Sequence, residues 1–273
     1  SKLLVSGVLL IASSGVGATV VDGVRQKPVP EKAAFQYGEV LYLYNVASKQ
    51  YYCGANDWET RASVSETGWK VKVTKFVTDS TEWDGQTVIV KDSVVNGSYK
   101  GKWLKAWFTT SQNEAKDSTW LDGGLYTDHN GQADTLWTIS QLDGNIVRLG
   151  ASPLNTDYDA TRIASLPSFV GVDLALDGGG NTRLWAFLSP SVATNAIDWY
   201  FVTPEAYAAN QEALAVFEVA QALKAQIDAA KSRGIDVSAQ VAVYENEAST
   251  IDELNAAIVA VKEAVAAYEE SHV

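Results

Sequence analysis

The residues best suited to chemistry gather in one stretch, between Thr119 and Trp137. It contains three aspartates, a histidine and an asparagine-glycine pair: Asp122, Asp128, His129, Asn130, Gly131 and Asp134. Loops that wrap calcium place oxygen ligands at alternate positions around a glycine. Asp128, Asn130 and Asp134 surround Gly131, but the distal glutamate that completes such loops is missing. Calcium at these three residues is therefore one hypothesis. The other is a turn at the asparagine-glycine pair, which needs no cofactor.

Other metal and catalytic sites find little support. His129 and His272 are the only histidines, and Cys53 is the only cysteine. A transition-metal site needs several such ligands, and a nucleophilic triad needs a histidine beside a serine or cysteine. Neither histidine lies in the sequence context of a nucleophile elbow. We therefore predict no metal cofactor and no enzyme activity. Glycoside hydrolysis stays open as a second alternative, because its two carboxylates are set by distance in the fold.

Three segments carry the groups that recognise a sugar. A sugar has an apolar ring face and a rim of hydroxyls, so its site combines an aromatic plate with carboxylate and amide groups. The candidate ligand-binding residues are Asn56, Asp57, Trp58, Trp120, Asp122, Asp177, Asn181 and Arg183. The competing interpretation is structural: the tryptophans pack over the ends of a barrel, and the glycines form turns.

Composition restricts the class of partner. The chain has 273 residues, of which 47% are hydrophobic and 20% are charged, as in an ordinary globular protein. Its net charge of -12 argues against a nucleic-acid partner, because phosphate binding requires a basic face. Nine tryptophans and twelve tyrosines supply either a β core or exposed plates for sugars.

Short β-rich runs follow one another from Glu39 to about Phe201, separated by clusters of Gly, Asn, Asp and Ser. No helical period intervenes, which indicates an all-β barrel or sandwich. A weak repeat of roughly 50 to 60 residues is also present. Each unit has a strand pair, a turn and a strand centred on a tryptophan, and the run "KWLKAWF", residues 102–108, is expected to begin the second unit. These tryptophans are Trp69, Trp137, and either Trp185 or Trp199.

Three units of four strands would form a β-trefoil. The stretch "LYLYNVASKQYYCGANDW", residues 41–58, resembles the opening of a unit in ricin-B-like and MIR-like trefoil modules. The resemblance covers residues 35–207 and implies a secreted bacterial module that binds glycans. The Gln-x-Trp signature of sugar-binding ricin-type repeats is absent, because the matching tryptophans lie in "LWTI", "LWAF" and "DWYF".

The last 70 residues have a helical pattern. Thr203 and Pro204 can begin a helix that Gly234 ends, and Thr250 with Glu253 forms a capping box for another. The pieces "AQALKAQIDAAKSRG" and "LNAAIVAVKEAVAAY" resemble FIVAR-type repeats of bacterial surface proteins, which implies a helical hairpin or three-helix bundle. From Glu205 onward, twelve acidic and four basic residues give a net charge of -8, typical of a solvated surface.

The start of the chain has the layout of a secretory signal peptide. Lys2 precedes an apolar run, Leu3 to Ala12, that is too short to span a bilayer. We therefore expect a secreted or cell-surface protein with no stable membrane insertion after the signal is removed. The expected organisation is a signal peptide (1–18), a linker (19–34), a β-trefoil-like domain (35–203) and a helical domain (204–273).

These patterns together predict a non-catalytic binding protein. Its trefoil would bind carbohydrate or glycan, and its helices would serve as a spacer or interaction module. The alternative is a structural or adhesin-type surface component whose trefoil binds a surface protein. Aromatic side chains grouped with aspartate and asparagine favour the glycan, whereas a broad apolar patch favours the protein partner.

Overall fold

A computed structural model describes most of the chain as two compact units. The described residues are 18–54, 62–78, 81–92, 101–108, 123–129, 136–151, 169–173, 183–187 and 196–272. One unit comprises Lys32–Tyr207, and the other combines Ser1–Glu31 with Ala208–Val273. We call them the trefoil unit and the helical unit.

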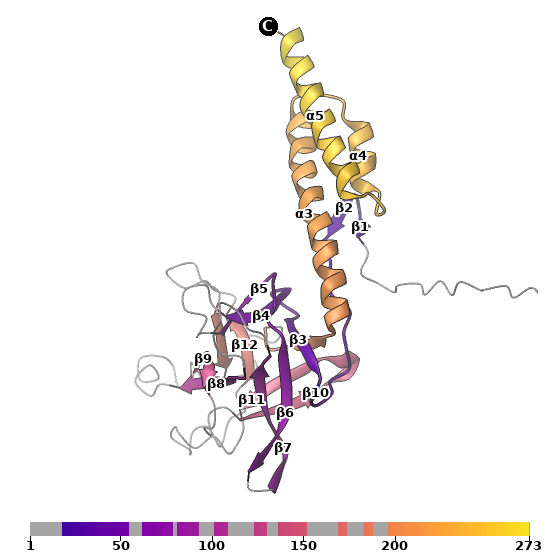
Figure 1. The fold of residues 1–273 in the computed structure, drawn as a ribbon. Coiled ribbons are helices and arrows are strands. Elements are labelled where there is room, and N and C mark those ends of the chain that lie inside the picture. The colour runs from indigo at the N-terminus through magenta and orange to yellow at the C-terminus, as the bar shows by residue number, and fades with distance from the viewer. Residues whose placement is uncertain are drawn as a thin grey trace, which may run out of the picture. The chain divides into compact units, whose positions relative to one another are not determined.

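Strands account for nearly all regular structure between residues 40 and 202 (Figure 1). In chain order they are β3 (Val40–Asn45), β4 (Gln50–Gly54), β5 (Ala62–Ser65), β6 (Val71–Thr78), β7 (Thr81–Lys91), β8 (Trp103–Phe108), β9 (Gly123–His129), β10 (Trp137–Gln141), β11 (Val147–Ala151), β12 (Phe169–Asp173), β13 (Arg183–Phe187) and β14 (Trp199–Val202). A short 3₁₀ helix, η2 (Asp143–Asn145), joins β10 to β11.

The strand pairings define a β-trefoil. Six strands pair antiparallel in the cyclic order β3, β6, β7, β10, β11 and β14, and β14 pairs back to β3 to close a barrel. The other six form three hairpins, β4–β5, β8–β9 and β12–β13. Each hairpin belongs to a unit of four strands: β3–β6, β7–β10 or β11–β14. The predicted all-β trefoil-like barrel followed by helices is therefore confirmed.

The units begin at different points from those that the repeat suggested. The run from Lys102 to Phe108 was expected to open the second unit, but it forms β8, the second strand of that unit. The first strand is β7, which continues from β6 through a hairpin. The expected strands also omitted β5 and β9. Both are third strands of their units. Strand β5 is only four residues long and β9 begins with two glycines, so neither gives a clear strand signal in the sequence.

Alternation along β3 separates two cores within the trefoil unit. Leu41 and Leu43 point into the barrel and join its buried cluster, which also contains Trp137 and Trp199. Tyr42 and Tyr44 point outward, as successive strand residues must, yet both are buried in a second cluster. Strand β3 is consequently buried on both faces.

Three helices follow: α3 (Pro204–Ser232), α4 (Ser238–Glu245) and α5 (Ile251–Ser271). Thr203 Oγ1 accepts the amide hydrogen of Ala206 at 3.1 Å, and α3 ends before Gly234, which has a φ of 77°. At α5, Thr250 and Glu253 make both bonds of the capping box. These predicted helix ends are confirmed.

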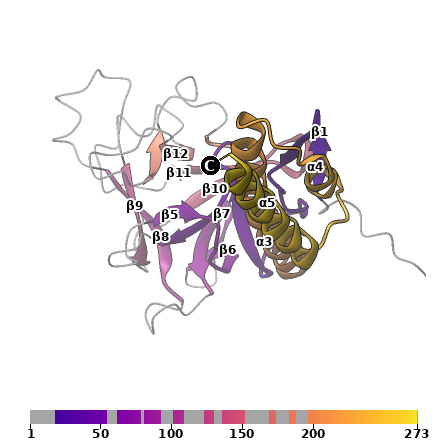
Figure 2. The ribbon, with the colours of Figure 1, turned by 90° about the horizontal axis from the view of Figure 1, so that it is seen from above.

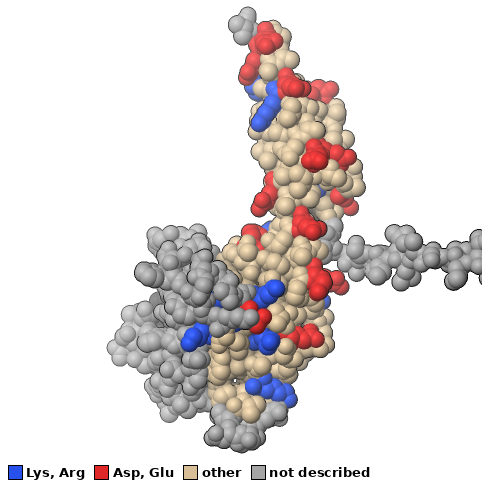
Figure 3. All heavy atoms as spheres, in the orientation of Figure 1, with Lys and Arg blue, Asp and Glu red and all other residues tan. Residues whose placement is uncertain are grey.

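Apolar stripes at three- and four-residue spacing hold the helical unit together. Figures 1 and 2 show α3, α4 and α5 packed side by side. Their buried core contains Leu223, Ile227, Tyr244, Leu254 and Val261. Asp and Glu side chains lie along the face of this unit drawn in Figure 3. No helix among the described residues has the length and apolar character needed to cross a membrane.

The segment assigned to a linker contains a β-hairpin. Strands β1 (Thr19–Val21) and β2 (Val24–Gln26) pair antiparallel within the helical unit. Asp22 and Gly23 join them with φ angles of 49° and 74°, the signs required by the commonest two-residue hairpin turns. An Asp-Gly pair between valines indicates such a hairpin, whereas the prolines that follow suggested a linker. Residues 1–17, which hold most of the expected signal peptide, lie outside the described residues.

Candidate functional site

Two tryptophans occupy equivalent structural positions and leave no ring face for a ligand. Trp137 and Trp199, each at the start of the fourth strand of its unit, are fully buried. The indole N–H of Trp137 donates to the Leu104 carbonyl at 3.0 Å, and that of Trp199 donates to the Val170 carbonyl at 2.9 Å. Both acceptors lie on the second strand of the same unit. These tryptophans therefore tie a barrel strand to its hairpin.

Trp69 is the third member of this set. Its backbone N–H donates at 2.9 Å to the carbonyl of Tyr52, on the second strand of the first unit, and the two rings meet edge to face. The ammonium of the buried Lys91 lies 3.7 Å from the ring centroid of Trp69, in cation–π geometry. Of the two tryptophans proposed for the third unit, Trp199 is the equivalent one, because Trp185 lies on β13, a third strand.

The candidate sugar-binding residues fall in one kind of connection. Asn56, Asp57 and Trp58 lie between β4 and β5, Trp120 and Asp122 between β8 and β9, and Asp177 and Asn181 between β12 and β13. These seven residues are outside the described residues. Arg183 is the first residue of β13 and is described by its backbone. Each segment is thus the link between the second and third strands of its unit.

Antiparallel pairs close the three connections at their bases. The pairs are Gly54 with Ala62, Phe108 with Gly123, and Asp173 with Arg183. The third strands of the three units are neighbours, because β9 pairs with β13 and β5 contacts both. The bases of the three connections therefore belong to one cluster of strands. An aromatic ring, a carboxylate and an amide on such connections have the chemistry to stack on a sugar and bond its hydroxyls.

The calcium hypothesis receives no further support. Asp128 lies on β9, and Asn130 and Asp134 are outside the described residues. Among the residues that the structure describes, no group of three or more His, Cys, Asp or Glu side chains could hold a metal ion. The turn expected at Asn130 and Gly131 also lies outside the described residues.

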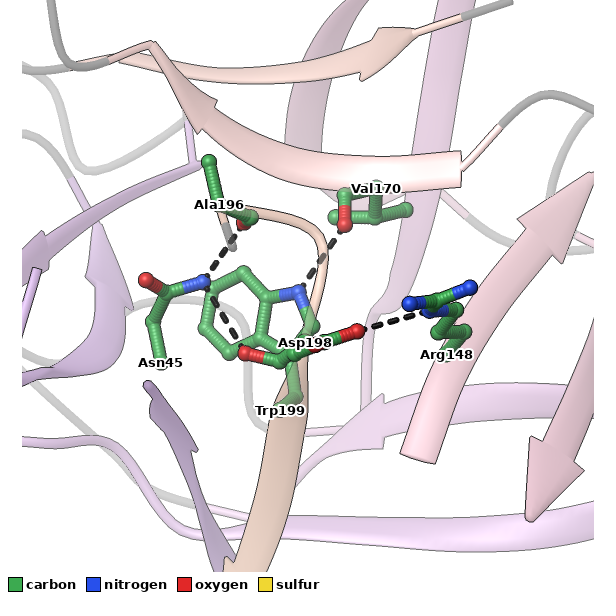
Figure 4. Close-up of polar contacts among 6 residues, drawn as sticks. All are labelled: Asn45, Arg148, Val170, Ala196, Asp198 and Trp199. Carbon is green, nitrogen blue, oxygen red and sulfur yellow. Dashed lines mark hydrogen bonds and ion pairs between the residues drawn. The ribbon is translucent and has the colours of Figure 1, made fainter. Parts of the chain in front are cut away.

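Asn45, part of the motif on which the trefoil resemblance rested, has a structural role. Its Oδ1 accepts the backbone N–H of Ser48 at 2.9 Å and so shapes the turn between β3 and β4. Its Nδ2 donates to the Ala196 carbonyl at 2.7 Å, as Figure 4 shows, and to the Asp198 carbonyl at 3.4 Å. Asn45 therefore latches the first turn of the trefoil to the approach of its last strand.

An ion pair supports the same region from outside the barrel. Arg148 Nε lies 2.6 Å from Asp198 Oδ1, and the two side chains are 29% and 22% exposed (Figure 4). A partly exposed pair of this kind contributes at most about 1 kcal/mol. It orients the segment that accepts hydrogen bonds from Asn45, and we assign it no ligand.

A cluster of five buried or partly buried tyrosines was not predicted from the sequence. Its members are Tyr42, Tyr44, Tyr51, Tyr200 and Tyr207. Tyr207, in the first turn of α3, stacks on Tyr42 with ring centroids 3.8 Å apart. A Cβ at Gly68 would lie 2.7 Å from the Cβ of Tyr51, which explains the glycine. Tyrosine at every second position of "YLY", followed by "WYF", is the signal that could have revealed this outward cluster.

These tyrosines and Cys53 are unreactive for a common reason. Burial raises the pKa of Tyr44, Tyr51 and Tyr200, so all three stay protonated beyond the pH at which an exposed tyrosine ionises. Burial also raises the pKa of the Cys53 thiol to about 11, which removes the thiolate that a nucleophile requires. The cluster is a packing element of the barrel wall.

Comparison with known proteins yields structural similarity only. No family model and no curated protein matches the sequence. The chain is similar to the botulinum neurotoxin serotype D binding domain, with 8% identity, a TM-score of 0.45 and coverage of 66% of this chain and 46% of that one. For the ligand-binding domain of that serotype in complex with N-acetylneuraminic acid, the values are 9%, 0.44, 66% and 43%. For the lysenin pore they are 12%, 0.39, 64% and 49%. The chain spans less than half the length of these structures, and the trefoil assignment rests on its own strand pairings.

Proposed function

We propose that this chain is a non-catalytic binding protein that takes carbohydrate through its β-trefoil. The observation that carries the proposal is the equivalence of the three connections between second and third strands. Each contains an aspartate (Asp57, Asp122 or Asp177), and each adds a tryptophan or an asparagine. A carboxylate beside a ring or an amide suits the hydroxyls and ring faces of a sugar.

The tryptophans divide into a structural group and a candidate ligand-binding group. The indole N–H groups of Trp137 and Trp199 donate hydrogen bonds to buried backbone carbonyls of the trefoil, so these tryptophans are structural. Trp58 and Trp120 fall in two of the connections between second and third strands, and we assign them as the stacking plates. Loss of a stacking aromatic removes a large part of the contact area of a sugar.

A glycan array probed with the full chain is the first test. We expect binding to one class of neutral glycan, because the candidate residues include three carboxylates and a single arginine. Absence of binding to every glycan by a folded chain would favour the rival function, a surface component whose trefoil binds protein.

Substitution of the two candidate plates is the sharper test. Trp120→Ala and Trp58→Ala should each weaken glycan binding by about tenfold, the scale of one lost aromatic contact. Tyr37→Ala is the matched control, because Tyr37 is 41% exposed and precedes the first trefoil strand. Binding that survives both tryptophan substitutions would show that the site lies elsewhere on the trefoil.

We also propose secretion or display at the cell surface, where glycans are met. The support is the apolar run from Leu3 to Ala12 with a lysine before it. The acidic helical unit would then act as a soluble spacer or interaction module. Fractionation of the producing cells, with detection of the mature N-terminus, tests this location.

A further inference from the structure

The two ends of the helical unit enclose the whole trefoil in the sequence. Residues up to Glu31 and from Ala208 onward belong to one unit, and Lys32–Tyr207 form the other. Where the chain enters and leaves the trefoil, Ala33 forms a β-bridge with Phe201 and donates to its carbonyl at 2.8 Å. Adjacent entry and exit points are the feature that lets one domain be inserted into another.

The hairpin β1–β2 docks onto the C-terminal end of α4. The last carbonyls of a helix have no partner within it. In α4, the Ala242 carbonyl accepts the backbone N–H of Asn246, and the Val243 carbonyl accepts the hydroxyl of Ser249, both from nearby in the sequence. The carbonyl of Tyr244 instead accepts from Arg25 Nε at 2.6 Å, across 219 residues of chain.

Arg25 makes further contacts at the same place. Its second terminal nitrogen donates to the Asn246 carbonyl at 2.7 Å, and its backbone N–H donates to the Tyr244 hydroxyl at 3.1 Å. Its guanidinium carbon lies 5.8 Å from the ring centroid of Tyr244. A cation is favoured at a helix C-terminus, where the helix dipole is negative. Arg25 is only 3% exposed, so these bonds form away from water.

The other strand of the hairpin is also engaged. The backbone N–H of Val20 donates to Glu247 Oε1 at 2.7 Å. Val20 and Arg25 face each other in the hairpin register, so the outward N–H groups of both strands are satisfied by the segment from Tyr244 to Glu247. The segment from Tyr244 to Glu247 therefore binds both strands of the hairpin, β1 through Val20 and β2 through Arg25.

We propose that residues 18–26 are a strap that completes the helical unit, with Arg25 as its lock. The trefoil is then a module inserted into a discontinuous helical domain, and both of its ends are tied to that domain. A break in the chain between the hairpin and the trefoil would leave the strap bound without a covalent link. This inference concerns domain organisation and is independent of what the trefoil binds.

Cleavage of the full-length chain tests the strap. A recognition sequence for a site-specific protease, inserted between Pro30 and Glu31, allows a single cut after folding. We expect the N-terminal fragment to co-elute with the remainder in gel filtration. Arg25→Met should speed its release at least about tenfold, because charge-assisted hydrogen bonds to the Tyr244 and Asn246 carbonyls are lost.

Three further variants separate a lock from a general folding defect. Arg25→Lys keeps the charge without the two-nitrogen geometry and should give an intermediate release rate. Tyr244→Phe removes only the acceptor of the Arg25 backbone N–H and should have a smaller effect. Gln26→Met, at an exposed neighbour on the same strand, should change nothing.

Optical signals show which unit responds. All nine tryptophans lie in the trefoil unit, so their fluorescence should stay native in every variant. Helical ellipticity should melt at a lower temperature once the cut strap has left. The proposal is overturned if the cut fragment separates as fast with Arg25 as with methionine, or if its departure leaves the helical melting temperature unchanged.

Discussion

The barrel of the trefoil unit and the start of α5 in the helical unit are specified over different ranges of sequence. In the trefoil, β14 pairs with β3 to close the barrel, and Asn45 bonds the Ala196 carbonyl across 151 residues. In the helical unit, Thr250 and Glu253 cap α5 across three residues. The trefoil therefore forms only when distant segments meet, whereas the start of α5 is specified by residues within its own first turn.

The two units also differ in what fills their cores. The trefoil buries tryptophans and tyrosines whose polar groups need partners, such as the Trp199 indole N–H. The helical unit buries mainly leucine, alanine, isoleucine and valine, which need none. Because all nine tryptophans lie in the trefoil, fluorescence and helical ellipticity can follow the two units separately.

The largest difference should appear at alkaline pH. Burial raises the pKa of Tyr44, Tyr51 and Tyr200 in the folded trefoil, whereas an unfolded tyrosine ionises at about 10. Their contribution to stability is complete below pH 10 and is lost as the pH rises above it. We expect tyrosinate absorbance from this cluster to appear together with unfolding of the trefoil, in one cooperative step followed by tryptophan fluorescence.

Tyr44→Phe refines this prediction. The hydroxyl of Tyr44 is buried and has no hydrogen-bond partner among the described residues, so its removal costs no bond. We expect the variant to be as stable as the parent at neutral pH, or more stable, and to unfold at a higher pH. Gradual tyrosinate absorbance near pH 10 that is smaller in Tyr44→Phe than in the parent, with the trefoil still folded, would contradict the role assigned to burial.

Features set by neighbouring residues could be predicted from the sequence, whereas features set by contacts between distant segments could not. Helix ends at Thr203, Gly234 and Thr250 were predicted correctly because the capping residues lie within a turn of the ends they cap. The trefoil class was also predictable: the β-rich runs indicated a barrel or sandwich, and their weak repeat together with the resemblance of residues 41–58 indicated a trefoil. The start of the second unit was not, because β7 is assigned to that unit by its pairing with β10, fifty residues further along the chain.

Residues whose roles depend on distant partners were the hardest to anticipate. Arg25 reads as one charge in a linker until the end of α4 is placed beside it. Tyr207 reads as a helical residue until its ring is seen stacked on Tyr42. The candidate sugar residues were chosen by residue type, and the strand order places seven of the eight in one kind of connection, with Arg183 on β13. Whether they bind a sugar stays a prediction.

A smaller effect, confined to the trefoil, should follow removal of a buried indole. Trp199→Ala should lower the free energy of unfolding of the trefoil by about 3–5 kcal/mol, because the ring is fully buried and leaves a cavity. Denaturant unfolding followed by fluorescence of the remaining tryptophans measures the loss. Trp137→Ala, at the equivalent position, should cost a similar amount, and Val77→Ala, at a residue 56% exposed, should cost little. A loss of stability in Trp199→Ala without one in Trp137→Ala would show that the second and third four-strand units of the trefoil are not energetically equivalent.

The smallest effect tests whether the helical unit depends on its local caps. Thr250→Ala removes the hydroxyl that accepts the Glu253 N–H at 3.2 Å and should cost about 1 kcal/mol. Thermal unfolding followed by helical ellipticity measures it, and tryptophan fluorescence should report an unchanged trefoil. Glu253→Gln is the matched control, because glutamine also completes a capping box and should cost less. A loss several times larger than 1 kcal/mol would mean that the start of α5 is needed by the rest of the helical unit.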